Sequence, residues 1–266
     1  MLLSIISDHI VWRHQIFKLA KSDMIKTYTG AALGWAWAVI KPSVTIFVFW
    51  FAFSIGLRMG GPIEGYPFLL WLTAGMIPWF YMLEMITGGT GAFTKYSFLI
   101  TKMKFPVATI PTFVGISKLF IHICLMALVV GLFLLHGYKP DIYYLQLPIY
   151  MLLMLLIFIN VALFEAALSA MSKDFMNLVN SFTNALFWLS GIMFDVHEIN
   201  IHWLRVLLMF NPVTFIASGY RNVFIYKVWI WEQPQEFLLF IGALVVTAVL
   251  GIWSFKRLYK EIPDVL

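Results

Sequence analysis

Three ionisable residues, Glu84, Lys118 and Glu165, lie inside long apolar runs of this sequence. A charged group is costly in lipid, so such residues usually pair with one another or line a pathway. Lys118 could pair with either carboxylate, and His122, one helical turn further on, shares its face. Two interpretations follow. The charges could form a buried ion pair that fixes helix packing, or Lys118 could help to neutralise an anionic group that enters from the cytoplasm.

Motifs for nucleotide binding, metal binding or catalysis are missing from the sequence. No G-x-x-x-x-G-K-[ST] pattern occurs, and the glycine-rich residues 88–91 lack the lysine of a P-loop. His197 and His202 resemble a zinc-protease pair, but their i, i+5 spacing puts them on different helix faces, whereas zinc ligation needs i, i+4. No G-x-S-x-G nucleophile motif is found either. We therefore expect no catalytic residue, no metal site and no cofactor in this chain.

The composition places these residues in a membrane. The chain has 266 residues, of which 62% are hydrophobic and only 12% are charged. A soluble domain of this length could not bury so much apolar surface. The net charge of +5 suits anionic lipid better than nucleic acid, because no basic cluster exceeds a few residues. Cys124 is the only cysteine, which excludes an intrachain disulfide.

The elements that must position the charged residues are apolar runs of spanning length, and they predict an all-α integral membrane protein. Residues 34–266 form its transmembrane domain, with six spans at about 34–57, 66–87, 107–135, 144–171, 175–194 and 237–255. An excess of Lys and Arg on one side predicts that both termini face the cytoplasm.

Two segments outside the spans are amphipathic or interrupted. Residues 1–33 mix cationic and apolar side chains at helical spacing, which predicts a helix lying in the membrane interface; a soluble cap on the bundle is the alternative. Residues 195–234 are too apolar for a solvated loop and too interrupted for a clean span. We expect two short re-entrant helices there, with a seventh span as the alternative.

Three further segments carry a family resemblance: LAKSDMIKTYTGAALGWAWAVIKP, FTKYSFLITKMKFP and FNPVTFIASGYRNVFI. Their order and spacing resemble the permease subunits of polysaccharide-exporting ABC transporters of the ABC-2 type. Within that family the sequence is most similar to the teichoic acid translocation permeases of Gram-positive bacteria. Permeases for O-antigen or capsular polysaccharide are the alternative, and an ABC-2 drug or lipid exporter is a more distant one.

The resemblance implies partners and a coupling element. It implies a homodimer in the bacterial cytoplasmic membrane, joined to two copies of a separate P-loop ATPase that binds ATP and Mg. The complex would move a polymer linked to undecaprenyl diphosphate. Residues 93–104 correspond to the helix that docks on the ATPase, where the contact residues would be Phe93, Lys95, Tyr96, Phe98, Leu99, Lys102 and Lys104. A plain positive-inside loop would explain the lysines but not the apolar centre.

Two other groups of residues have expected roles in an export mechanism of this kind. Basic residues at the cytoplasmic side would meet the diphosphate head group, with Arg13, Lys18, Lys21, Lys41 and Lys118 as candidates. Residues 195–234 correspond to external gate helices, where we single out Asn211, Pro212, Tyr220 and Arg221. Two rival classes are a secondary carrier and a membrane-embedded transferase. The absence of inverted repeats weighs against the first, and the absence of an Asp/Glu/His cluster on one loop weighs against the second.

Overall fold

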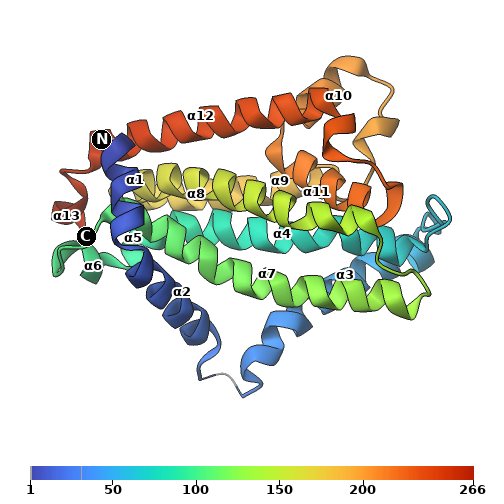
Figure 1. Cartoon of the computed structure of the whole chain (residues 1–266), viewed down its shortest axis with the longest axis horizontal. Coiled ribbons are helices and arrows are strands. Elements are labelled where there is room, and N and C mark those ends of the chain that lie inside the picture. The colour runs from blue at the N-terminus through green and yellow to red at the C-terminus, as the bar shows by residue number, and fades with distance from the viewer. Residues whose placement is uncertain (1, 31) are drawn as a thin grey trace.

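Helices build the part of the chain described by the computed structural model, residues 2–30 and 32–266 (Figure 1). Within these residues, five helical segments are long and apolar enough to cross a membrane: Gly34–Gly56, α4 (Phe68–Thr90), Val107–Leu135, Ile142–Met171 and α12 (Pro234–Leu258). Three of these segments combine elements. The segment Gly34–Gly56 consists of a 3₁₀ turn (Gly34–Ala36), α3 (Trp37–Phe51) and a π-helical turn (Ala52–Gly56). A 3₁₀ turn at Val107–Thr109 precedes α7 (Ile110–Leu135), and another at Ile142–Gln146 precedes α8 (Leu147–Met171). The all-α prediction is confirmed.

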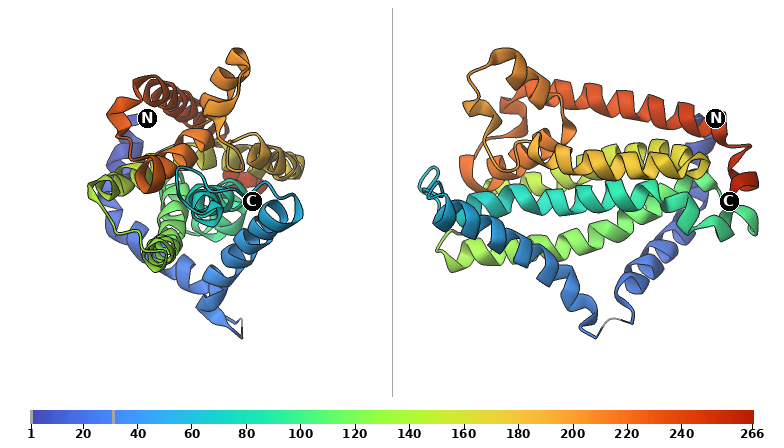
Figure 2. Two further views of the ribbon diagram at one scale, coloured as in Figure 1. Left: turned by 90° about the vertical axis from the view of Figure 1, so that its right-hand side faces the viewer. Right: turned by 180° about the vertical axis from the view of Figure 1, so that it is seen from behind.

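Helix α4 lies at the centre of the bundle, and most of its side chains are buried. It packs against α3, α7, α8, α11 (Pro212–Arg221) and α9 (Lys173–Trp188), while α12 lies along α8 (Figure 2). Proline at the first turn of α7, α8 and α12 favours these helix starts, because an N–H at this position would have no partner within the helix.

Helix α9 is shorter than the predicted span at 175–194. Its 16 residues extend about 24 Å, less than the hydrocarbon core of a bilayer. The helix ends at Trp188, and the chain then turns through Gly191, whose φ is +63°. A Cβ at Gly191 would lie 2.4 Å from the Val196 side chain, so the turn requires glycine.

The N-terminal segment forms two helices, α1 (Leu2–Val11) and α2 (Arg13–Tyr28), where one was predicted over residues 1–33. Residues 1 and 31 of that range lie outside the described residues. Helix α2 packs on α7 through Ile16, Ala20 and Asp23, and its C-terminal end diverges from the bundle and approaches the start of the α3 segment (Figure 1).

The two ends of the bundle differ in their elements. One end carries both termini, α5 (Ala92–Lys95), α6 (Ser97–Thr101) and α13 (Ile262–Val265), which contacts α6 (Figure 1). The predicted helix over 93–104 is therefore two short helices, and residues 102–104 are not helical. The opposite end carries α10 (His202–Met209), α11, a π-helical turn (Asn222–Tyr226) and 3₁₀ turns at Val196–Glu198 and Ile230–Glu232.

Candidate functional site

A cavity of about 200 Å³ lies between α3, α4 and α7, and its α4 residues belong to the half of that helix that leads to α5, near the termini. Tyr28, the last residue of α2, also lines it. Its walls combine apolar side chains with four ionisable ones besides Tyr28 and Tyr81: Lys41, Glu84, Lys118 and His122. The structure therefore brings together Lys41 and Lys118, two of the basic residues singled out in the sequence, with one carboxylate.

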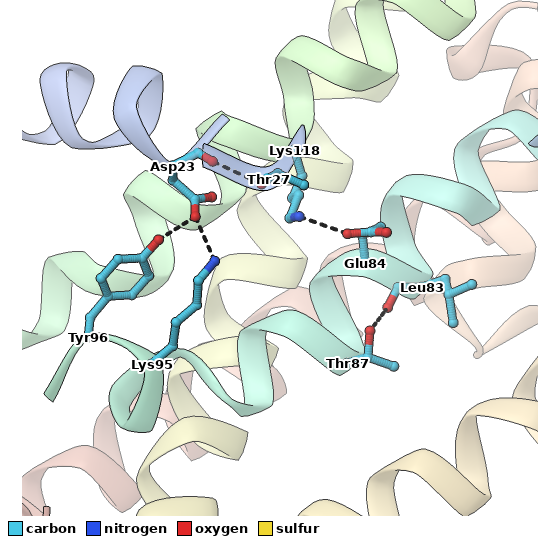
Figure 3. Close-up of polar contacts among 8 residues, drawn as sticks. All are labelled: Asp23, Thr27, Leu83, Glu84, Thr87, Lys95, Tyr96 and Lys118. Carbon is cyan, nitrogen blue, oxygen red and sulfur yellow. Dashed lines mark hydrogen bonds and ion pairs between the residues drawn. The ribbon is translucent and has the colours of Figure 1, made fainter. Parts of the chain in front are cut away.

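Lys118 pairs with Glu84 across the cavity wall. The Nζ atom of Lys118 lies 2.8 Å from Oε2 of Glu84 (Figure 3). The Lys118 side chain is only 9% exposed, whereas that of Glu84 is 56% exposed. Glu165, the other candidate partner, instead accepts a hydrogen bond of 2.9 Å from the Thr90 hydroxyl. The ammonium group is thus held in place on α7, while its counter-ion lies at the open side of the cavity.

Tyr28 and Lys41 add further donors to the cavity. The Lys41 side chain is exposed, and α3 carries it one turn after Trp37, which also lines the cavity. Burial raises the pKa of the Tyr28 hydroxyl above its usual value, and the negative charge of Glu84 adds to this shift. Tyr28 therefore stays a neutral hydrogen-bond donor. Two ammonium groups and a phenol can together bind an anionic oxygen group.

The other predicted head-group residues lie elsewhere. Arg13, Lys18 and Lys21 are exposed on α2 and are not among the residues that line the cavity. They turn away from the face of α2 that packs on α7. The structure thus separates a basic helix surface from the basic cavity.

His122 links the cavity to the opposite half of the bundle. Its Nε2 atom shares a hydrogen bond of 2.7 Å with the hydroxyl of Tyr220, which belongs to α11. Both side chains are buried. Tyr220 was singled out with the gate helices, and the structure places it against a residue of the cavity wall. A movement of α11 would therefore change the environment of His122.

The remaining gate residues fix α11 to its neighbours. Asn211 caps α11 by accepting a hydrogen bond from the backbone N–H of Val213, and its amide donates to Ser190 at 2.8 Å. Pro212 occupies the first turn of α11. The buried Arg221 guanidinium lies 3.4 Å from the centre of the Trp71 ring and donates to the carbonyl oxygens of residues 191 and 192.

The predicted coupling residues divide into a buried and an exposed set. Phe93 and Leu99 are buried in the bundle core, and Tyr96 is half-buried. The exposed set is Lys95, Phe98, Lys102 and Lys104. Phe98 is the one apolar residue of the exposed set. A docking partner that contacted this set would therefore meet one aromatic ring among three lysines.

Asp23 is a residue that the sequence analysis missed. Its carboxylate is 2% exposed and accepts hydrogen bonds from Lys95, at 2.7 Å, and from the Tyr96 hydroxyl (Figure 3). Burial alone would raise the pKa of Asp23, but these hydrogen bonds and the charge of Lys95 outweigh burial and hold the pKa below its usual value. Asp23 lies seven residues after Ile16 and three after Ala20, so the three share one helix face, and this spacing could have revealed the buried position of Asp23.

The described residues contain no group of three or more His, Cys, Asp or Glu side chains that could hold a metal ion. His197 lies in a 3₁₀ turn and His202 in α10, so the two do not share a helix.

Comparison with known proteins assigns the fold to a family. The family described as ABC-2 type transporter matches residues 14–225. The chain belongs to this family. It is thus a multi-pass membrane permease, which is a transmembrane subunit without an ATPase domain. Permeases of this family pair with an ATPase subunit and typically carry no cofactor themselves.

Two relatives match nearly the whole permease. The O-antigen export system permease protein RfbA of Myxococcus xanthus is 21% identical over 261 residues, which cover 98% of this chain and 96% of the relative. The protein of the same name from Klebsiella pneumoniae is 20% identical over 251 residues, which cover 93% of each chain. The permease is therefore distantly related to polysaccharide export permeases.

Proposed function

We propose that this permease exports a polysaccharide linked to undecaprenyl diphosphate across the bacterial cytoplasmic membrane. Two copies of the permease would pair with two copies of a separate ATPase, which binds ATP and Mg. The observation that carries this proposal is the cavity in which Lys41 and Lys118 converge beside Glu84. A diphosphate group is the anion that a lipid-linked polymer would bring to such a site, and charge-assisted hydrogen bonds are the natural form of recognition.

The relatives support one class of polymer over another. Both are O-antigen export permeases, and teichoic acid, the first prediction from the sequence, finds no support among them. We therefore place an O-antigen type of polysaccharide ahead of teichoic acid as the cargo.

The proposed topology has six crossings with both termini in the cytoplasm. Helix α9 would serve as a short fifth crossing, together with the turn that follows it. Helices α1 and α2 would lie in the cytoplasmic membrane interface, and α10 and α11 would enter the membrane from the outside without crossing it. In this topology the basic cavity lies in the cytoplasmic half, where a lipid-linked diphosphate is delivered.

The mechanism begins with exchange of a counter-ion. The head group would displace Glu84 from Lys118, since the Glu84 side chain lies at the open side of the cavity and the ammonium group does not. ATP binding by the partner would act on the exposed residues of α5 and α6. Asp23 would pass this movement to α2, because it holds Lys95 and Tyr96 of the coupling segment. The polymer would leave through the interface of the two permeases as the lipid reorients.

Substitution of the two lysines tests the proposal. Lys41→Ala and Lys118→Ala should each raise the cytoplasmic pool of lipid-linked polymer and lower surface polymer, by roughly tenfold if one charge-assisted contact to phosphate is lost. Lys139→Ala removes an exposed lysine from the opposite end of the bundle and is the matched control. Glu84→Gln should keep export, because it removes the competing carboxylate and not the cation.

Two results would overturn the proposal. Unchanged export and unchanged lipid-linked polymer in both lysine variants would refute head-group recognition in the cavity. Failure of any P-loop ATPase to co-purify with the permease would refute an ATP-driven exporter altogether.

A further inference from the structure

The end of the bundle opposite to the termini carries a polar cleft between α10 and the start of α12. Its larger part has a volume of about 490 Å³ and is lined by His197, His202 and Arg205 on one side and by residues 232–236 on the other. A neighbouring part of about 450 Å³ shares His197 and Gln233 and extends to Glu64 and Asp195. Together these parts form what we term the outer cleft.

The walls of the outer cleft are held in place by their own hydrogen bonds. Gln233 accepts a hydrogen bond of 2.6 Å from the Asn222 amide, and the Glu232 carboxylate accepts one of 2.8 Å from the backbone N–H of Trp229. Arg205 donates from Nε and Nη2 to the carbonyl oxygen of Ile199, at 3.0 and 2.6 Å. Polar groups that are already positioned lose little freedom when a ligand binds, so the cleft is preorganised.

The residue types in the outer cleft suit a saccharide. The carboxylates accept hydrogen bonds, the guanidinium donates them, and the amides of Gln233 and Gln235 do both. This set matches sugar hydroxyls, each of which is a donor and an acceptor. A lipid or an apolar drug would need a mostly apolar pocket. The 3₁₀ turn that supplies Glu232 also presents Trp231, which is 62% exposed and stacks on Trp229 at 4.5 Å. Such a ring offers a platform for the apolar face of a sugar.

The charge of the outer cleft selects among saccharides. Four carboxylates line the cleft, those of Glu64, Asp195, Glu232 and Glu236. They share it with the Arg205 guanidinium and two imidazoles, of which His197 lies 3.5 Å from Glu236, so carboxylates remain the most numerous charged groups. Like charges repel, so a chain of phosphates would be disfavoured and an uncharged or amino-substituted chain would not. This surface is opposite in character to the basic cavity around Lys118.

We propose that the outer cleft binds an uncharged or amino-substituted stretch of the exported saccharide as it leaves the permease. The inference rests on the proposed export function and deepens it, because it names the chemical class of the cargo. A polymer with phosphate in every repeat, such as a teichoic acid, would not fit the cleft.

The test is binding of the complete complex with its ATPase, in lipid nanodiscs, to an array of bacterial glycans. The array includes uncharged, amino-substituted and phosphate-bearing chains. We expect the first two kinds to bind, and the double variant Gln235→Ala, Glu236→Gln to lower this binding by about tenfold, as loss of a hydrogen bond or two predicts. Gln15→Ala, which replaces an exposed glutamine of α2 at the opposite end, should bind as the unmodified complex does.

A second pair of substitutions tests the charge argument. Glu64→Lys with Glu232→Lys should shift the preference toward phosphate-bearing chains. The proposal is overturned if phosphate-bearing chains bind best to the unmodified complex, if the Gln235/Glu236 variant binds as well as the unmodified complex, or if no chain binds while the complex still hydrolyses ATP. Export itself is judged separately: lipid-linked polymer that accumulates when the permease is depleted would support the proposed function even if the outer cleft bound nothing.

Discussion

Arg221→Met should loosen the contact between α11, α4 and the turn after α9. In the native permease Arg221 is 2% exposed, and its guanidinium donates from Nη1 to the Gly191 carbonyl oxygen at 2.6 Å and from Nη2 to that of Ile192. Its planar group also lies against the Trp71 ring, at 3.4 Å from the centre. Gly75 allows this approach, because a Cβ there would lie 2.5 Å from Nη2. Methionine has a similar length but no donors.

The size of the effect can be worked from these contacts. Two buried carbonyl groups lose their partner, at about 1–3 kcal/mol each, and a desolvated cation–π contact of about 2 kcal/mol is lost. The methionine variant no longer has to desolvate a charge, which offsets part of this loss. We expect a net destabilisation of about 3 kcal/mol. For a chain of this length that lowers the unfolding midpoint by roughly 6–12 °C.

The assay is thermal unfolding of the purified permease in detergent, followed by intrinsic fluorescence and by size-exclusion chromatography. The melting temperature of Arg221→Lys should lie between those of the native permease and Arg221→Met, because a single ammonium group cannot reproduce the planar fork of the guanidinium. Arg205→Met is the matched control: Arg205 also donates to a carbonyl oxygen, but it is half-buried, so water can replace it and the cost should stay below about 1 kcal/mol. If Arg221→Met melted within about 1 °C of the native permease, or no lower than the Arg205→Met control, the reasoning would be refuted.

Two further predictions concern the end of the bundle that carries the termini. Asp23→Asn should be less stable than the native permease at neutral pH. The folded-state pKa of Asp23 lies below its unfolded value, so its contribution is complete above the unfolded pKa of about 4 and disappears as the pH falls through the folded one. Melting curves of both proteins between neutral and acid pH would show this, and a difference that grew on acidification would contradict it. Gly89→Ala should destabilise the permease by about 1–3 kcal/mol, because the new Cβ would lie 2.6 Å from that of Ala162 on α8. Gly88→Ala meets nothing within 4 Å and should be neutral or slightly stabilising in the same melts, so equal losses in both variants would rule out steric contact as the cause.

The spanning helices could be predicted from the sequence because their signal is local. An apolar run of bilayer length must be helical in lipid, whatever packs against it. The end of α9 could not be predicted in this way. It depends on a left-handed Gly191 and on Val196, which occupies the space a Cβ would need, and neither shows in the hydropathy of residues 175–194.

The choice of partner for Lys118 also required the structure. From the sequence, Glu84 and Glu165 are expected at similar depths in the membrane, so depth does not distinguish them as partners of Lys118. The close contact of Gly89 with Ala162 brings α8 against the end of α4, and Glu165 then lies beside Thr90 instead of facing α7. Helix packing thus decides which carboxylate lies beside the Lys118 ammonium group, and the spacing of the residues in the sequence does not predict this packing.

The hydrogen bond between His122 and Tyr220 connects two regions of the bundle that are distant in sequence. The two residues are 98 positions apart, and no periodicity relates them. Yet their contact joins the wall of the basic cavity to the last turn of α11. Arg221 directly follows Tyr220 there, and the helix continues into the π-helical turn that supplies Asn222 to the outer cleft. A head group that displaced Glu84 would alter the charge beside Lys118, one turn from His122. If α11 responds to that change, the cavity and the outer cleft are coupled through one buried side-chain pair, and a Tyr220→Phe permease should bind a lipid-linked anion normally while exporting it more slowly.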